Sequence, residues 1–168
     1  MKGGAVVWIT GPPAAGKSTF AALLSARLRA AAIPCAVLDG DQVRAALGRP
    51  AGRGEAERDD FYLALARLAA LLAGQGLVAI VPATAPRRVH RDRARTLTSR
   101  FVEVQLETPP EECARRDPKG LYAAARAGRA PGLPGAGVAY EPAVAPEVAA
   151  RGGEDLAAVE AVVARVSQ

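Results

Sequence analysis

The sequence is poor in the residues that most often build metal, redox and nucleophile sites. Of its 168 residues, two are cysteines and one is a histidine. Cys35 and Cys113 lie far apart and form no Cys-x-x-Cys pair, which excludes a zinc site or redox dithiol built from these residues. The single histidine, His90, lies in the arginine-rich stretch PRRVHRDRAR, and we expect it to be a solvated helix residue.

Long apolar runs are also missing. The runs at 5–9 and 77–81 are among the longest, and they fall far short of the roughly 20 residues that a membrane-spanning helix needs. The opening MKGGAVVWIT has neither the long apolar region nor the small-residue cleavage site of a secretory signal. We therefore expect no membrane partner and a cytoplasmic location.

Aromatic residues make up 4% of the chain, while the net charge is +5. Because the arginines are scattered and few rings are available for base stacking, we do not expect the protein to bind nucleic acid. The positive charge instead favours a small anionic partner.

Apolar, strand-like runs alternate with runs of helical period, the pattern of a parallel sheet with helices on both faces. We predict strands at 5–10, 35–38, 77–81 and 101–106. We predict helices at 17–32, 55–72, 87–99, 109–116 and 154–166, the fourth with Thr108 as its N-cap. The length suits one domain over 1–168. The span 117–147 is rich in Gly, Pro and Arg and is expected to be a functional surface excursion.

The segment GPPAAGKS at 11–18 matches the phosphate-loop pattern GxxxxGK[ST] and stands between a predicted strand and a predicted helix. Backbone N–H groups in such a loop and at the helix N-terminus point at phosphate oxygens. Lys17 would add its charge at the β- and γ-phosphates, and the Ser18 hydroxyl would bind Mg²⁺. The residues predicted to bind the nucleotide here are Gly11, Pro12, Pro13, Ala14, Ala15, Gly16, Lys17, Ser18 and Thr19.

Two carboxylates, Asp39 and Asp41, follow the second predicted strand. Since ligands bind beyond the carboxyl ends of parallel strands, both should face the phosphates. They can share two tasks, holding the Mg²⁺ shell and accepting a proton from an acceptor hydroxyl. The alternative for Asp41 is to N-cap a short helix through Leu47.

These motifs resemble the adenylylsulfate kinase family, P-loop kinases that phosphorylate the 3′-hydroxyl of adenosine 5′-phosphosulfate with MgATP. The resemblance covers about residues 5–147 and rests on GPPAAGKST, LDGDQVR at 38–44, PRRVHRDRAR at 86–95, CARRDPKGLYAAARAG at 113–128 and AYEP at 139–142. It implies a P-loop nucleoside-triphosphate-hydrolase-like three-layer α/β sandwich with a mostly parallel sheet. It also implies a lid at about 117–147 and a fifth strand shortened to about 148–151.

The resemblance implies a role for each matching residue on the donor side. Asp39 and Asp41 carry the metal and base roles, and Lys17 joins them in catalysis. Ser18 and Asp41 would be the metal ligands, and ATP and Mg²⁺ the cosubstrate and cofactor.

On the acceptor side, the resemblance implies that Arg44 and Arg58 reach the anionic groups of the acceptor. Arg116 and Lys119 belong to the nucleotide and lid region. The expected partner is a small anionic acceptor, a nucleotide, and a homodimer is a further possibility.

The chain departs from the family on this acceptor side. The family's ENIRR stretch, whose Asn and Arg bind the sulfated nucleotide, is replaced by DFYLA at 60–64. Two aromatic positions that sandwich the acceptor adenine fall on Arg53 and Leu133. Arg53 can still stack on a base through its planar guanidinium, whereas Leu133 offers only apolar contact. A serine that some members phosphorylate falls on Ala85, so that position offers no phosphoserine.

Three hypotheses follow from these observations. In the leading one, the protein phosphorylates adenosine 5′-phosphosulfate in sulfate assimilation, and other residues have taken over acceptor recognition. The candidates for that replacement are Arg53, Tyr62, Arg87 and Arg126. In the second, a kinase of the same family acts on another acceptor, such as a nucleotide conjugate or a specialised metabolite. The third is a nucleotide-binding regulator without phosphotransfer, against which the retained pair of aspartates argues.

Overall fold

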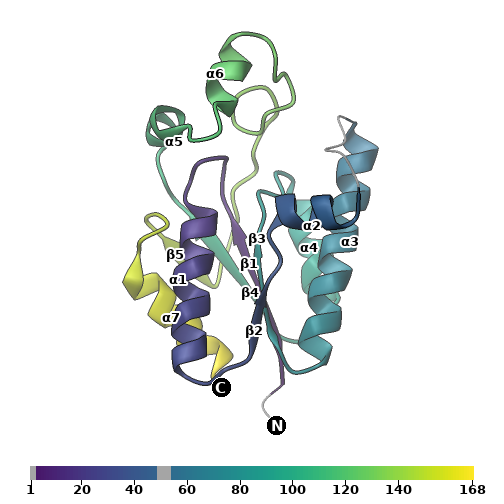
Figure 1. The fold of residues 1–168 in the computed structure, drawn as a ribbon, viewed down its shortest axis with the longest axis vertical. Coiled ribbons are helices and arrows are strands. Elements are labelled where there is room, and N and C mark those ends of the chain that lie inside the picture. Colours follow the sequence, from purple (N-terminus) through teal and green to yellow (C-terminus); the bar gives the residue numbers. More distant parts are fainter. Residues whose placement is uncertain (1–2, 49–53) are drawn as a thin grey trace.

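The computed structural model describes residues 3–48 and 54–168, which form a three-layer α/β sandwich (Figure 1). Its sheet has five parallel strands in the order β2-β3-β1-β4-β5. The strands are β1 (Ala5–Thr10), β2 (Cys35–Val37), β3 (Val78–Pro82), β4 (Phe101–Leu106) and β5 (Val148–Ala150). The predicted bounds of the first and fourth strands are confirmed, and those of the other strands differ by one residue at one or both ends.

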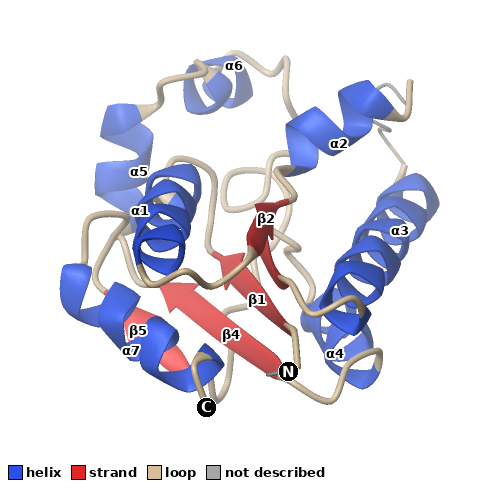
Figure 2. Ribbon diagram, turned by 60° about the horizontal axis from the view of Figure 1, so that its bottom comes forward, coloured by secondary structure: helices blue, strands red, loops and turns tan. Residues whose placement is uncertain are grey.

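Helices cover both faces of the sheet (Figure 2). They are α1 (Lys17–Ala30), α2 (Gly40–Ala46), α3 (Glu55–Gly74), α4 (Arg88–Thr96), α5 (Pro110–Arg116), α6 (Leu121–Arg126) and α7 (Leu156–Val166). α1 packs beside α7 on one face, and α3 beside α4 on the other. α2, α5 and α6 lie beyond the carboxyl ends of the strands (Figure 1). In the described part of the chain, no helix is long and apolar enough to cross a membrane.

The core has one hydrophobic cluster on each face of the sheet, and β1 contributes to both. Val7 and Ile9 belong to the cluster under α1 and α7, whereas Val6 and Trp8 belong to the one under α3 and α4. All six residues of β1 are buried, because a central parallel strand has no face turned to water. This rigid central strand leads directly into the phosphate loop.

Two local predictions are wrong, for Thr108 and His90, and the alternative role of Asp41 as an N-cap is excluded. α5 has Pro109, not Thr108, at its N-cap position, and the Thr108 hydroxyl instead donates to the carbonyl of Ala15 at 2.7 Å. Asp39, not Asp41, caps α2. His90 is buried rather than solvated, because α4 turns it toward Asp59 and Tyr62 on α3.

Candidate active site

The phosphate loop occupies residues 11–16, between β1 and α1, as the motif predicts. Ala14 and Gly16 have positive φ angles of 63° and 100°. The left-handed region is costly for a residue with a Cβ, so Ala14 stores strain at the tip of the loop. At Gly16 a Cβ would lie 2.8 Å from the backbone nitrogen of Gly153, so this position requires glycine.

Side chains from two distant segments hold the peptide groups of the loop. Besides Thr108, which binds the carbonyl of Ala15, the Tyr122 hydroxyl donates to the carbonyl of Pro13 at 2.9 Å. The sequence analysis missed both anchors, since neither hydroxyl belongs to a phosphate-binding pattern. They tie the loop to α5 and α6 and thereby fix its shape.

Lys17 lies at the first position of α1, and its ammonium folds back over the loop. Nζ donates to the carbonyl oxygens of Gly11 at 2.9 Å and Pro12 at 2.8 Å. Burial lowers the pKa of Lys17 to about 8, against the opposing effect of the nearby acidic groups. The loop therefore carries a cation whose charge is lost in mildly alkaline solution.

The loop opens onto a cleft of about 490 Å³. Its lining residues come from the loop and α1 (13–14, 16–19), the start of α2 (39–41, 44), α3 (61–62), the end of β3 (82–84) and the segment after α5 (116–119, 121). The structure thus brings the phosphate loop, both aspartates and Arg44 together, as the sequence predicts.

The two aspartates differ in their surroundings. Oδ1 of Asp39 accepts hydrogen bonds from the backbone N–H groups of Asp41 at 3.0 Å and Gln42 at 3.2 Å, which caps α2. Asp41 is exposed, and its carboxylate forms an ion pair with Lys119. Asp39 is therefore fixed by the backbone, whereas Asp41 can exchange its partner.

A second pocket of about 540 Å³ adjoins the loop at Gly16 and Thr19. Arg116 and the turn 151–155, which follows β5, form the rest of its lining. Arg116 also lines the first cleft, and its guanidinium forms an ion pair with Glu112. The sequence analysis missed this turn, although its Gly152-Gly153 pair was a visible signal of close backbone packing.

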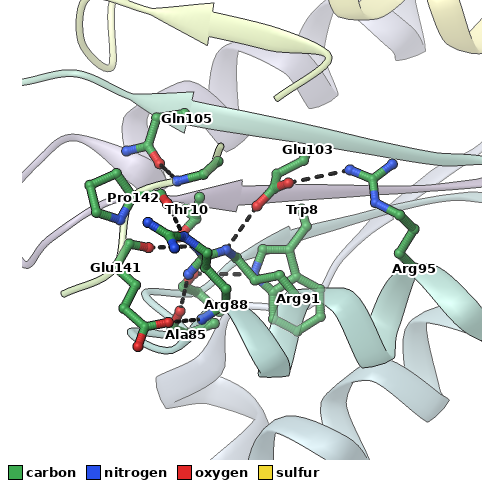
Figure 3. A network of polar contacts seen from close by, with 12 residues as sticks. Trp8, Thr10, Ala85, Arg88, Arg91, Arg95, Glu103, Gln105, Glu141 and Pro142 are labelled. Carbon is green, nitrogen blue, oxygen red and sulfur yellow. Dashed lines mark hydrogen bonds and ion pairs between the residues drawn. The ribbon is translucent and has the colours of Figure 1, made fainter. Parts of the chain in front are cut away.

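A buried polar network supports the wall of the cleft at the end of β3 (Figure 3). Arg91, 1% exposed, donates from Nε to Oε1 of Glu103 at 2.8 Å and also reaches the carbonyl oxygens of Ala85 and Glu141. Thr10 donates to the carbonyl oxygen of Thr84 at 2.7 Å. The signal for this network was a glutamate within the apolar strand FVEVQL, because a buried carboxylate requires a buried cation.

The residues predicted to bind the acceptor do not all reach the cleft. Arg44 lines it, whereas Arg58 instead donates to the carbonyl oxygen of Gly132 at 3.2 Å. Leu133 is buried in the core cluster under α1 rather than placed in the cleft wall. Arg53 lies outside the described residues.

Among the candidate replacements, Tyr62 lines the cleft and is buried. Burial is also the largest influence on the Tyr62 hydroxyl and raises its pKa. Arg87 pairs with Glu55 and, at 3.7 Å, with Asp59 outside the cleft, and Arg126 is exposed on α6. In the stretch that replaces the family's ENIRR, Phe61 falls on the Asn position, and Phe61 and Tyr62 both line the cleft.

Known proteins resemble the chain in sequence. A family model described as adenylylsulphate kinase matches residues 3–151. The adenylyl-sulfate kinase of Picosynechococcus sp. strain PCC 7002 is 40% identical over 148 residues, covering 88% of this chain and 84% of that protein. The bifunctional enzyme NodQ of Rhizobium sp. strain N33 is 44% identical over 146 residues, or 86% of this chain, but the match spans only 23% of NodQ.

Solved structures agree. The Mycobacterium tuberculosis APS kinase CysC in complex with AMPPNP and APS superimposes with a TM-score of 0.91 at 36% identity, covering both chains fully. A hexameric APS kinase from Thiobacillus denitrificans gives a TM-score of 0.70 at 26% identity, over 99% of this chain and 29% of that one. The chain, with its phosphate loop and paired aspartates on one cleft, belongs to the adenylylsulfate kinase family.

Proposed function

We propose that the protein is an ATP-dependent small-molecule kinase that transfers the γ-phosphoryl group of MgATP to the 3′-hydroxyl of adenosine 5′-phosphosulfate, a step of sulfate assimilation. The observation that carries this proposal is one cleft that holds the phosphate loop, the carboxylates of Asp39 and Asp41, and Arg44. Family membership and the relative that binds AMPPNP and APS support the choice of both substrates.

The donor nucleotide fits along the loop. The N-terminus of α1 and the loop amides attract the phosphates, and Lys17 can exchange its two carbonyl partners for phosphate oxygens. The neighbouring pocket at Arg116 and the turn 151–155 can hold the nucleoside, because it adjoins the loop at Gly16 and Thr19.

The oxygen groups near the loop fit Mg²⁺. Ser18 offers an exposed hydroxyl and Asp41 an exposed carboxylate, and hard oxygen ligands are those that Mg²⁺ prefers. Among the described residues, no cluster of three or more His, Cys, Asp or Glu could hold a metal, which agrees with an ion held mainly by phosphates. When bound, Mg²⁺ neutralises charge on the phosphate oxygens.

Asp39 is suited to accept the proton of the acceptor hydroxyl. Two backbone amides fix its Oδ1, and its Oδ2 has no protein partner among the residues that the structure describes. Asp41 would then serve the metal shell, and Lys119, released from Asp41, could move to the phosphates. Transfer without metal or base would be slow, because the attacking hydroxyl is a weak nucleophile.

The segment 117–147 would close over both substrates as a lid. It includes α6 and touches the phosphate loop through the Tyr122 hydroxyl. Arg58 reaches it from α3 through the carbonyl of Gly132. Closure would exclude water and limit wasteful ATP hydrolysis.

We extend the proposal to the assembly and location of the protein. A homodimer is the smallest symmetric assembly, and the hexameric relative supports self-association. The need for ATP supports a cytoplasmic site of action. Light scattering on the purified protein and fractionation of cells test these two statements.

A coupled ADP-release assay with saturating MgATP and adenosine 5′-phosphosulfate tests the main proposal. We expect acceptor-dependent turnover that Asp39→Asn lowers about 10²-fold or more, with ATP binding retained. Absence of turnover in the wild-type protein that still binds MgATP would reject the acceptor.

The aromatic wall at Phe61 and Tyr62 supports a second candidate, a kinase of this family with another hydroxylated acceptor. Turnover of a member of a metabolite panel above that of adenosine 5′-phosphosulfate would favour it. A panel in which adenosine 5′-phosphosulfate is the best acceptor would dispose of it.

A further inference from the structure

A row of side chains in contact with one another runs from the cleft into the protein. The guanidinium carbon of Arg44 lies 3.6 Å from the ring centroid of Phe61. Phe61 meets Tyr62 edge to face, with centroids 5.7 Å apart, and Tyr62 packs on His90 at 4.7 Å. Nε2 of His90 lies 2.6 Å from Oδ1 of Asp59 at the far end. Helices α2, α3 and α4 are thus joined through one row.

Arg44 differs from the other cations that line the cleft. Lys17 is bound by loop carbonyls, Lys119 is paired with Asp41, and Arg116 is paired with Glu112. Among the residues that the structure describes, Arg44 donates no side-chain hydrogen bond, and its guanidinium lies over the face of the Phe61 ring. Because all five N–H donors of a guanidinium lie in its plane, stacking on one face leaves them free for an anion.

The ring of Phe61 is the rigid partner in this contact. Phe61 is 4% exposed within the core cluster under α3, whereas α2, which carries Arg44, has no fully buried residue. A long arginine side chain on such a short helix would otherwise sample many rotamers, and ordering it costs conformational entropy. The stack removes part of that cost before a ligand arrives.

We propose that Phe61 is a positioning residue that holds the guanidinium of Arg44 ready for the anionic group of the acceptor. This inference rests on the proposed function, since it assigns the Arg44 side of the cleft to the acceptor. Tyr62, His90 and Asp59 support Phe61 from behind. The acceptor side therefore recognises an anion through one preorganised arginine, which an aromatic residue keeps in place.

Steady-state kinetics with MgATP and adenosine 5′-phosphosulfate test the role of Phe61. Phe61→Leu keeps an apolar side chain but removes the ring, and we expect the acceptor KM to rise about three- to tenfold. The ATP KM and kcat should stay within about twofold, because the phosphate loop is untouched. Phe61→Tyr keeps an aromatic ring, and its acceptor KM should stay close to the wild-type value.

A double-mutant cycle shows whether Phe61 acts through Arg44. Arg44→Met should raise the acceptor KM more than Phe61→Leu does, and the double variant should be no worse than Arg44→Met alone. If the rise in acceptor KM of the double variant equalled the product of the two single rises, the proposal would be overturned, because Phe61 would then act independently of Arg44. An equal rise in the KM for ATP would also overturn it.

Loss of stability is separated from loss of positioning by a matched core variant. Leu65 is fully buried in the same cluster, about one helical turn from Phe61, and does not line the cleft. Leu65→Val should lower the melting temperature while leaving the acceptor KM unchanged below that temperature. A raised acceptor KM in this control would show that general loosening of α3 explains the Phe61 result.

A readout without turnover keeps this inference distinct from the proposed function. In nitrogen-15 NMR spectra the Nε–H resonance of Arg44 should show a ring-current shift that Phe61→Leu abolishes. Inorganic sulfate should perturb the same resonance, with affinity about three- to tenfold weaker in Phe61→Leu. If the wild-type protein shows no turnover but sulfate still perturbs the Arg44 resonance, and does so more weakly in Phe61→Leu, the acceptor is rejected and the positioning role stands. If the wild-type protein turns over the acceptor but the Arg44 resonance does not change in Phe61→Leu, the proposed function stands and the positioning role is rejected.

Discussion

The backbones of Gly16 and Gly153 touch, because a Cβ built on Gly153 would lie 2.5 Å from the carbonyl oxygen of Gly16. Gly16 is the N-cap residue of α1, and Gly153 lies in the turn between β5 and α7. The wall of the proposed nucleoside pocket is thus in direct contact with the phosphate loop. A substitution in the turn should therefore change the shape of the phosphate loop and the affinity for the nucleotide phosphates.

Gly153→Ala should weaken binding of MgATP about tenfold or more, because the obstructing atoms are backbone and the loop must shift. Gly152→Ala is the matched control, since its Cβ would meet Oγ1 of Thr108 at an ordinary 3.6 Å. Its affinity should stay within about twofold of the wild-type value. Isothermal calorimetry measures both, and equal affinities for the two variants would contradict the coupling.

The affinity for ATP should fall as the pH rises through about 8. Burial lowers the pKa of Lys17 to about 8, so the free protein loses this charge in mildly alkaline solution. Because phosphates favour the protonated form, binding above pH 8 must take up a proton, and affinity can fall by up to about tenfold per pH unit. Calorimetry in two buffers of different ionisation enthalpy measures the uptake. Constant affinity from pH 7 to 9.5 would contradict this assignment, and Lys17→Arg should remove the dependence.

Thr108→Val should destabilise the protein by about 1–3 kcal/mol, because it leaves the buried carbonyl of Ala15 without its donor. Denaturant unfolding gives the difference in free energy. Thr108→Ser keeps the hydroxyl and should retain most of the stability. Equal destabilisation of the two variants would contradict this prediction, because Thr108→Ser retains the hydroxyl that Thr108→Val lacks.

The phosphate-loop side of the cleft was predictable because it is local in sequence. The strand, the loop and the first turn of α1 are consecutive, so the pattern at 11–18 specifies residue types and geometry together. The aspartates after β2 follow from a topological rule, since parallel strands end at the same edge of the sheet. Buried apolar runs such as β1 gave strand bounds directly.

What could not be predicted depends on contacts between distant segments. Thr108 lies 93 residues from the loop carbonyl that it binds, and its position before two prolines equally suited an N-cap. His90 lies among arginines, a context typical of solvent, yet Asp59 and Tyr62 on α3 enclose its ring. A single sequence does not reveal which helix packs beside α4.

Breaking the buried ion pair of Arg91 should be far more costly than breaking a surface pair. Glu103→Gln leaves the Arg91 guanidinium buried without its charge partner, which costs about 3–5 kcal/mol. The control is Glu160→Gln, which breaks the exposed pair with Arg27 and should change stability little. Denaturant unfolding at neutral pH gives the stability of both variants. A similarly small loss of stability in both would mean that the charge of Glu103 contributes little to the stability of the fold.

The stability of the protein should decrease as the pH falls from about 7 to 5. Burial lowers the pKa of His90 below its ordinary value of 6.5, and the hydrogen bond with Asp59 only partly opposes this effect. The unfolded chain therefore takes up a proton more readily than the folded protein, so acid below about pH 6.5 favours unfolding, by at most about 1.4 kcal/mol per pH unit.

His90→Phe keeps a ring against Tyr62 but cannot titrate, and its stability should vary less over the same range. Asp59, whose pKa is lowered by its hydrogen bond to His90, loses its contribution only below about its ordinary value of 3.8 and so lies outside this window. Because His90 is the one histidine of the chain, denaturant unfolding at several pH values isolates its effect. If the free energy of unfolding varied with pH equally in the wild type and in His90→Phe, other groups would cause the pH dependence and the prediction for His90 would be wrong.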